Sequence, residues 1–490
     1  SYDALNRPVT ITAPGGTQFQ FTYDAAGRRT RMDMGAAVAA EYVYDAANQL
    51  TGITYRRKTD NAVIASVGYT YDNAGNRATM ADDFGSHGFA YDDLHRLTSA
   101  VHPSSGALTT QSETFAYDAV GNRTSDAVRS GYAYDAANRL NSDSLHTYNY
   151  DNNGNLTAKT RASDNAQTTY VYDSQNRLTQ VNLPSGYSET LRYDATGRRI
   201  AKTVTRNGET IREQHYIYDG EDIAFVTGAD GALKAIYTHG PGTDEPLMLR
   251  KGASDYYLLA DGLGSIIAIA DQTGNIAERA QYQAYGKPVF RNEITASTSA
   301  WSQTSSLYSY TAREWDAETG LFYYRARYYA PDIGRFIQKD PVGYHPDYAY
   351  TNGNPVVNVD PMGTLTTPWG WIDMGEAQGQ KSAEWYADQY NKSTGLDVLG
   401  YGLGGLLASL WTPCTSDKTA TILSSALMAS QILKAAGIPQ TVVEGRKGTR
   451  IFQIRNTEGK PTFRLDTDKR GLHYHRWPDM NLHRPRDGGL

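Results

Sequence analysis

The stretch Tyr23-Asp-Ala-Ala-Gly-Arg-Arg29 decides the fold, because closely related copies of it recur along the first half of the chain. Other copies begin at Tyr71 (Tyr-Asp-Asn-Ala-Gly-Asn-Arg) and Tyr193 (Tyr-Asp-Ala-Thr-Gly-Arg-Arg). The Tyr-Asp pair occurs eleven times at short and nearly regular intervals, beginning at Tyr2, Tyr23, Tyr44, Tyr71, Tyr91, Tyr117, Tyr134, Tyr150, Tyr172, Tyr193 and Tyr218. A short repeat that recurs in this way indicates an architecture in which one supersecondary unit is stacked many times.

Each copy has the features of a strand followed by a turn. Residues before the tyrosine alternate in polarity, as in Phe19-Gln-Phe-Thr-Tyr23, which is the periodicity of a β-strand. The aspartate then opens a turn by accepting hydrogen bonds from nearby backbone N–H groups, and Gly or Asn three residues later takes the positive φ that the turn needs. We therefore predict a mostly β protein, in which hairpins stack into a continuous sheet and insertions at 81–87 and 104–112 form loops.

The composition agrees with many strands and turns. The 490 residues include 37 Tyr against 11 Phe, together with 46 Gly. The single cysteine, Cys414, excludes an intramolecular disulfide framework and a cysteine-rich zinc site. Because no run of 18 uninterrupted apolar residues occurs, we expect no stable membrane insertion of the repeat region.

The Tyr-Asp-x-x-Gly-Arg units resemble the YD repeats of Rhs proteins and of the related Tc-toxin C components. The resemblance covers about residues 1–363 and implies a β-hairpin strip wound into a hollow cocoon around a C-terminal toxin. It also implies that the chain is a piece of a longer secreted effector with two kinds of partner, a cognate immunity protein and the delivery proteins of a secretion apparatus such as type VI secretion. The toxin would act in the cytoplasm of a target cell.

The pattern changes at Ala312, where the sequence comes to resemble the Rhs core end signature. The signature includes two Asp-Pro-x-Gly motifs, which begin at Asp340 and Asp360. On spacing alone, each motif is a turn in which Pro fixes φ and Gly takes a positive φ. Two adjacent carboxyls can also act together, because one retains a proton and polarises a carbonyl while the other activates water.

The resemblance favours this second interpretation, since the paired motif is similar to the Rhs site of intramolecular aspartyl cleavage that frees the toxin. It implies Asp340 and Asp360 as the catalytic pair and a cut near Thr364-Leu365. The family usually has Leu directly after Asp-Pro-x-Gly, whereas this chain has Thr364 there and Leu365 next. We accordingly divide the chain into a YD-repeat shell (1–311), a core end with the autoprotease (312–363), a helical linker or pre-toxin segment (364–440) and a small basic β-rich toxin region (441–490).

Composition shifts sharply after residue 363. Residues 1–363 contain 33 of the 37 tyrosines and carry a net charge of -9, whereas 364–490 carry +3 and 441–490 alone carry +5. A basic cargo suits an acidic shell and an anionic target such as RNA, although a basic face without a partner is an equal alternative.

The segment beyond the boundary predicts a small α+β domain. Residues 376–392 and 416–436 have the periodicity of amphipathic helices. The apolar, glycine-rich stretch 396–410 between them is either a packing segment or a membrane-active one. Short alternating strands follow at 441–443, 449–455 and 462–466, and 472–476 could form another.

A histidine and arginine cluster near 469–486 is the candidate active site of the toxin. In a metal-free ribonuclease, one His takes the 2′-OH proton, another protonates the leaving oxygen, and Arg stabilises the phosphorane, so that no cofactor is needed. The acid–base candidates are His473, His475 and His483, and the phosphate partners are Arg464, Arg470 and Arg476.

Other interpretations of this segment stay open. The histidines could instead bind Zn²⁺ in a metal-dependent nuclease or lie unused on a basic strand. The short sheet after helices resembles, weakly, the barnase–EndoU–colicin–RelE-like ribonuclease toxins. Membrane disruption by 395–436, ADP-ribosyltransferase activity and a purely structural YD-repeat shell are the remaining alternatives.

Overall fold

The computed structural model describes residues 1–364 except 109, 294 and 343–346, together with 366–368 and the backbone of four strands between 440 and 476. The described residues are almost entirely β-strands and turns, with the short 3-10 helices η1 (Tyr310–Ala312) and η2 (Thr351–Gly353). The prediction of a mostly β protein is confirmed. The helices predicted at 376–392 and 416–436 lie outside the described residues, and no helix within those residues is long and apolar enough to cross a membrane.

The chain forms two compact units. The first contains Ser1–Thr12, Thr17–Glu213 and Tyr237–Asp397, and the second contains Ala13–Gly16, Gln214–Ile236 and Val398–Leu490.

The first unit begins with an antiparallel strip in which each strand pairs with the next along the chain. Its first sheet consists of β1 (Thr10–Thr12), β2 (Gln18–Tyr23), β3 (Arg29–Met34), β4 (Val38–Tyr44), β5 (Leu50–Arg57), β6 (Val63–Tyr71), β7 (Arg77–Asp82), β8 (Gly85–Tyr91), β9 (Leu97–Val101) and β10 (Ser112–Thr114). A separate pair follows, β11 (Ala116–Tyr117) and β12 (Arg123–Ser125).

The strip continues in the same manner after this break. Pairing resumes with β13 (Ala133–Tyr134), β14 (Leu140–Ser142), β15 (His146–Tyr150), β16 (Leu156–Arg161), β17 (Gln167–Tyr172), β18 (Leu178–Asn182), β19 (Tyr187–Tyr193) and β20 (Arg199–Arg206). A later run consists of β24 (Pro246–Lys251), β25 (Ser254–Ala260), β26 (Ile266–Asp271), β27 (Ile276–Tyr282), β28 (Pro288–Asn292) and β29 (Thr298–Ser299).

The strands of the second unit are also antiparallel. β21 (Glu209–Asp219) pairs with β22 (Asp222–Thr227), which pairs with β23 (Leu233–His239). Four further strands form one sheet in chain order, β36 (Gln440–Thr441), β37 (Arg450–Arg455), β38 (Pro461–Asp468) and β39 (Gly471–Arg476).

In the repeat that begins at Tyr23, the aspartate organises its turn as the sequence predicts. Asp24 Oδ1 accepts hydrogen bonds from the N–H groups of Ala26 and Arg28, each at 2.9 Å, and Oδ2 accepts one from Arg28 Nε at 2.7 Å. Gly27, three residues after the aspartate, has a φ of 86°. Burial acts to raise the pKa of the Asp24 carboxyl, but the hydrogen bonds from Arg28 outweigh it and hold the pKa below its usual value.

The tyrosine and arginine of a repeat join neighbouring repeats. The Tyr172 hydroxyl donates to the backbone oxygen of Leu156 in the preceding strand at 2.9 Å. The Arg177 guanidinium, which its own turn aspartate holds, lies over the ring of Tyr193 in the next repeat at 5.1 Å. Hydroxyls that bond an earlier strand in the same way belong to Tyr23, Tyr71, Tyr91, Tyr117, Tyr134 and Tyr193. Phenylalanine could not make this bond, which explains the excess of tyrosine.

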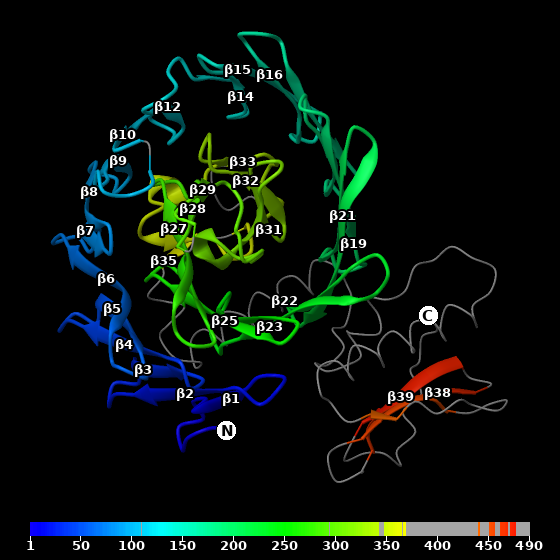
Figure 1. The fold of residues 1–490 in the computed structure, drawn as a ribbon. Helices are drawn as coiled ribbons and strands as arrows, with labels where there is room; N and C mark the ends of the chain where they lie inside the picture. Colours follow the sequence, from blue (N-terminus) through cyan, green and yellow to red (C-terminus); the bar gives the residue numbers. More distant parts are fainter. Residues whose placement is uncertain are drawn as a thin grey trace. The chain divides into compact units, whose positions relative to one another are not determined.

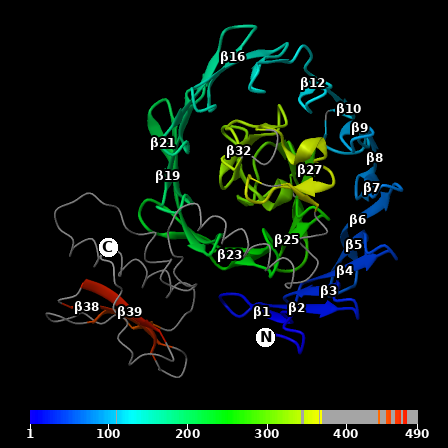
Figure 2. The ribbon, with the colours of Figure 1, turned by 180° about the vertical axis from the view of Figure 1, so that it is seen from behind.

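The core end forms a smaller body against which the strip packs. Its strands are β30 (Glu314–Asp316), β31 (Leu321–Tyr324), β32 (Arg327–Ala330), β33 (Arg335–Phe336), β34 (Asn358–Val359) and β35 (Thr367–Pro368). Figures 1 and 2 show the strip curving around this segment from both sides. Its centre is an aromatic cluster of Tyr310, Phe322, Tyr324, Tyr329, Phe336 and Tyr350.

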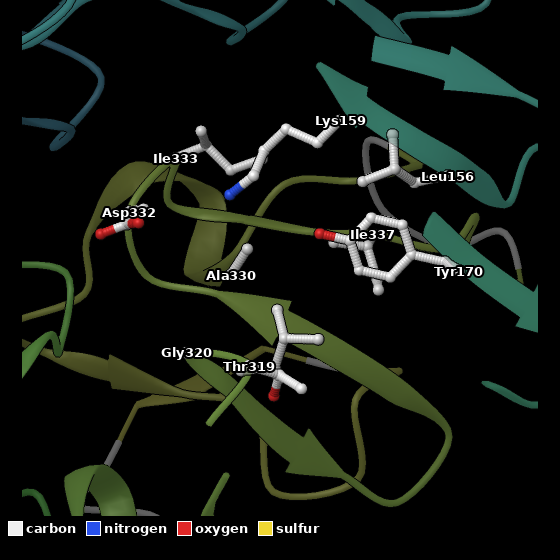
Figure 3. Close-up of a pocket in the computed structure, with 10 residues that line it drawn as sticks. Leu156, Lys159, Tyr170, Thr319, Gly320, Ala330, Asp332, Ile333 and Ile337 are labelled. Carbon is white, nitrogen blue, oxygen red and sulfur yellow. The ribbon is translucent and has the colours of Figure 1, made fainter. Parts of the chain in front are cut away.

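Contacts hold the core end to distant parts of the strip. Arg335 Nη1 donates to Asn122 Oδ1 at 3.0 Å, and the Tyr348 hydroxyl donates to Gly154 O at 2.8 Å. Figure 3 shows one of these interfaces, where Leu156 and Tyr170 of the strip approach Ile337 of the core end around a cavity of about 20 Å³. The cavity has room for about one water molecule, so the strip and the core end are closely packed there.

Candidate functional site

The second Asp-Pro-x-Gly motif forms a turn in which the Gly363 N–H donates to the Asp360 backbone oxygen at 3.2 Å, and the aspartates of both motifs are buried. Asp340, which follows β33, is 4% exposed, and Asp360, which follows β34, is 2% exposed. Asp340 Oδ1 accepts a hydrogen bond from the Val342 N–H at 2.8 Å, and Asp360 Oδ1 accepts one from the Thr364 N–H at 2.9 Å. The turn geometry therefore coexists with a pair of buried carboxylates.

A single arginine brings the two motifs together. Arg327 Nη2 lies 3.2 Å from Asp340 Oδ2 and 3.3 Å from Asp360 Oδ2, so one guanidinium nitrogen contacts both carboxyl groups. Arg327 Nη1 donates to the backbone oxygen of Asp347 at 3.1 Å, and its guanidinium lies 3.6 Å from the centre of the Phe336 ring. Position 327 at the start of β32 thus fixes the relative placement of Asp340 and Asp360.

The electrostatics of the group follow from burial. Burial lowers the pKa of Arg327, while the carboxylates of Asp360 and Asp340 act to raise it, and the net effect is a pKa below the usual value. One guanidinium faces two carboxyl groups, so a single proton shared by the carboxyls would make the trio neutral. Such a trio has the components for acid–base hydrolysis of an amide bond.

The second motif continues into the segment where the sequence predicts cleavage. β34 and β35 pair antiparallel, with Val359 opposite Thr367, and the connecting loop is described at 360–364 and 366. Gly363 has a φ of 69°, and a Cβ there would lie 2.4 Å from the Tyr324 backbone oxygen. Only glycine fits this close approach. The predicted cleavage point directly follows Thr364, and Leu365 lies outside the described residues.

The turn between β31 and β32 holds three successive carbonyls of this loop. Arg325 Nη1 donates to the backbone oxygen of Pro361 at 2.6 Å, and the Ala326 N–H donates to that of Met362 at 3.2 Å. Arg327 Nε donates to the backbone oxygen of Gly363. The loop is therefore bound along its backbone immediately before the predicted scissile bond.

Arg325 is in turn anchored by Asp244, from the loop between β23 and β24. Asp244 Oδ1 lies 2.6 Å from Arg325 Nη2 and 2.7 Å from Arg313 Nη1. Burial acts to raise the pKa of Asp244, but the two arginines outweigh it and hold the pKa below its usual value. The carboxylate is therefore a stable anionic anchor.

Four of the candidate toxin residues lie in β38 or β39, and the pairing of these two strands sets which residues are opposite one another. β38 and β39 pair so that Arg464 is opposite His475, Asp466 is opposite His473, and Phe463 is opposite Arg476. His483 and Arg470 lie outside the described residues. Within the part of the chain whose structure is described, no group of three or more His, Cys, Asp or Glu side chains is arranged to hold a metal ion.

Sequence analysis singled out neither Arg327 nor Asp244. Arg327 belongs to the run Tyr324-Arg-Ala-Arg-Tyr-Tyr329, and an arginine among residues destined for burial indicates a charged partner. That signal could have identified Arg327, but it does not say that the partners lie in two separate turns further along the chain. No comparable pattern marks Asp244, which lies in a Gly-rich loop far from Arg325 in sequence.

Comparisons with known proteins agree with this architecture. The family model described as Teneurin YD-shell matches residues 86–355, more than half of the chain, and the RHS Repeat model matches residues 2–39. The tRNA nuclease WapA of Bacillus subtilis (strain 168) is 30% identical over 339 residues, which cover 67% of this chain and 12% of that protein.

Two further matches extend over a larger share of the chain. Double-stranded DNA deaminase toxin A of Burkholderia cenocepacia (strain H111) is 28% identical over 413 residues, covering 74% of this chain and 28% of that protein. The solved structure titled TcdB2-TccC3-Cdc42 is similar with a TM-score of 0.59 and 24% identity, over 74% of this chain and 20% of that one. The chain thus spans less than a third of the length of these relatives.

Proposed function

Since the chain belongs to the YD-shell family, we propose that it is part of an Rhs-type polymorphic toxin whose shell releases an effector by intramolecular aspartyl cleavage near Thr364. The observation that carries the proposal is the buried trio of Asp340, Asp360 and Arg327, located beside the loop that contains the expected cleavage point.

The trio supplies the groups that hydrolysis of an amide needs. One carboxylate takes a proton from a water molecule, and the resulting hydroxide adds to the carbonyl carbon while the protonated carboxyl donates to the carbonyl oxygen. The C–N bond then breaks as a proton passes to the leaving nitrogen. The products are a carboxylate on Thr364 and an amine on Leu365.

Arg327 has two roles in this scheme. It lowers the electrostatic cost of bringing two carboxyls together, since its positive charge lies within 3.3 Å of both. It also fixes the loop by donating to the backbone oxygen of Gly363, so that the substrate bond and the acid–base pair share one anchor.

The test is to express the chain and follow its size on a denaturing gel. Asp340→Asn and Asp360→Asn should each leave it uncut, while Asp271→Asn, in an exposed turn with similar hydrogen bonds, should be cut normally. Mass spectrometry of the wild-type fragments should place the new end at or beside Thr364. Cutting of the Asp360→Asn chain at the normal rate would refute the assigned pair.

For the effector we propose a metal-free ribonuclease that uses His473 and His475. The support is the register of β38 and β39, which sets Arg464 opposite His475, and the basic composition of 441–490. The relatives named above act, by their names, on tRNA and on double-stranded DNA, which favours a nucleic-acid target.

Production of 364–490 inside cells, followed by electrophoresis of total RNA, tests this second proposal. Degraded RNA that becomes intact with His475→Ala would support it. Intact RNA together with a collapsed membrane potential would refute it in favour of membrane disruption by 395–436.

A further inference from the structure

The loop Gly240–Glu245 contacts the beginning of the strip directly and, through Arg325, the loop that follows Asp360, which we call the cleavage loop. Its Glu245 pairs with Arg29 of β3, with Arg29 Nη2 donating to Glu245 Oε2 at 3.2 Å, and its Asp244 pairs with Arg325 at 2.6 Å. We propose that Asp244 and Arg325 are positioning residues for the autoproteolysis, and that through Glu245 they make cleavage depend on closure of the strip. This inference rests on the proposed cleavage.

The substrate peptide is held along its backbone. An amide is hydrolysed efficiently only when its carbonyl is held in a defined position relative to the acid and the base. Here the carbonyls of residues 361, 362 and 363 are bound in order by residues 325, 326 and 327. Arg327 contributes one of these contacts and also touches the aspartates, whereas Arg325 joins the substrate backbone to its anchor, Asp244.

Arg325 is held in place by its contacts with Asp244. Arg325 has a φ of 55°, an uncommon conformation for a residue with a side chain, so its geometry depends on the surrounding contacts. Asp244 makes two of these contacts, through Oδ1 at 2.6 Å and Oδ2 at 3.1 Å. Because the pair is bidentate, it fixes the guanidinium plane and not only its charge.

The anchor Asp244 belongs to a loop of the strip. Asp244 and Arg325 are 81 residues apart in sequence, so their contact exists only once the strip has folded onto the core end. Glu245 extends this dependence to Arg29, 216 residues away along the chain. Two adjacent acidic residues therefore bind the first hairpins on one side and the cleavage site on the other. Cleavage before the strip has closed would lack a positioned substrate.

The experiment makes the full chain by a short pulse of cell-free translation and measures the rate at which the newly made chain is cut, on denaturing gels of samples taken over time. Asp244→Asn and Arg325→Met should each slow cleavage by about 10- to 100-fold, and the double variant should be no slower than the slower single variant. Arg325→Lys should recover part of the rate, because it keeps the charge and one donor. Glu245→Gln should slow cleavage by a smaller factor than Asp244→Asn does, because Glu245 binds Arg29, whereas Asp244 binds the arginine that holds the cleavage loop. The matched control is Asp173→Asn, which breaks the Arg177–Asp173 ion pair of 2.7 Å within a single turn of the strip.

Each outcome separates the two proposals. If the wild-type chain is not cut, or if Asp360→Asn is cut, the proposed aspartyl cleavage fails. If the wild type is cut, Asp360→Asn is uncut and Asp244→Asn is cut as fast as Asp173→Asn, only the positioning role is refuted. Circular dichroism and protease resistance of the uncut double variant Asp244→Asn/Asp360→Asn should match those of Asp360→Asn. A difference there, or additive effects of the Asp244 and Arg325 variants, would indicate a purely structural role and also overturn the inference.

Discussion

Replacing Glu189 by glutamine should stabilise the protein at pH 8 and have little effect at pH 4. Glu189 is a residue of β19 that is 1% exposed, and within the described residues its Oε2 accepts no hydrogen bond. Burial is the largest cause that raises the pKa of Glu189, the neighbouring carboxylate of Asp316 adds to it, and Lys202, Arg199 and Arg212 oppose it, giving a pKa of about 7.

The sign of the effect follows from proton linkage. Below the ordinary pKa of 4.5 the carboxyl is protonated in the folded and the unfolded chain, so it adds no pH dependence. Between pH 4.5 and 7 the unfolded chain loses this proton while the folded chain keeps it, so the folded state loses stability as the pH rises. Above pH 7 the loss is complete and amounts to about 3 kcal/mol, at about 1.4 kcal/mol for each pKa unit.

Urea unfolding followed by tryptophan fluorescence measures this difference. Glu189→Gln removes the ionisation while keeping the shape of the side chain, so its free energy of unfolding should exceed that of the wild type by up to about 3 kcal/mol at pH 8. Glu209→Gln, in an exposed position of β21, is the control and should not differ from the wild type. A Glu189→Gln chain that is equally or less stable than the wild type at pH 8 would refute the reasoning.

Three further predictions concern the repeat, the cleavage site and the effector. Tyr172→Phe should lower the free energy of unfolding by about 1 kcal/mol in the same urea assay, because it removes the bond to Leu156, and an unchanged value would contradict the proposed locking of repeats. Arg327→Met should abolish self-cleavage on a denaturing gel and cost about 3–5 kcal/mol of stability, since it leaves two buried carboxyls without their guanidinium. A chain cut at the normal rate would remove Arg327 from the site. His473→Ala and His475→Ala should each reduce RNA degradation by at least about 100-fold, and full activity of both would exclude them.

The parts of the fold that the sequence predicts are those built from local chemistry. The turn of Asp24 and Gly27 needs only residues within four positions of each other, so its repetition reveals the hairpins without knowledge of their packing. The tyrosine excess likewise indicated many strands, and the bond from the Tyr172 hydroxyl to Leu156 shows why tyrosine is preferred there to phenylalanine.

The parts that it does not predict depend on contacts between distant segments. Asp340 and Asp360 could be paired only through a resemblance, and Arg327, which joins them, has no local signature that names its partners. In the sequence, residues such as Glu189 and Asp244, whose charges become buried, cannot be told from ordinary polar residues of a strand and a loop. Their environment is created by segments that lie much further along the chain, such as those that carry Asp316 and Arg325, and strand periodicity carries no information about it.

The bonds between neighbouring repeats have a mechanical consequence. The Tyr172 hydroxyl holds the strand before it and the stacked Arg177 the repeat after it, while other tyrosines add a contact to the core end, as Tyr193 does with the Tyr328 hydroxyl at 3.1 Å. The junctions between neighbouring hairpins are therefore independent of one another, and under load the force peaks should be highest where a hairpin is also tied to the core end. The same independence means that hairpins could be added or removed during evolution without redesign of the remaining ones.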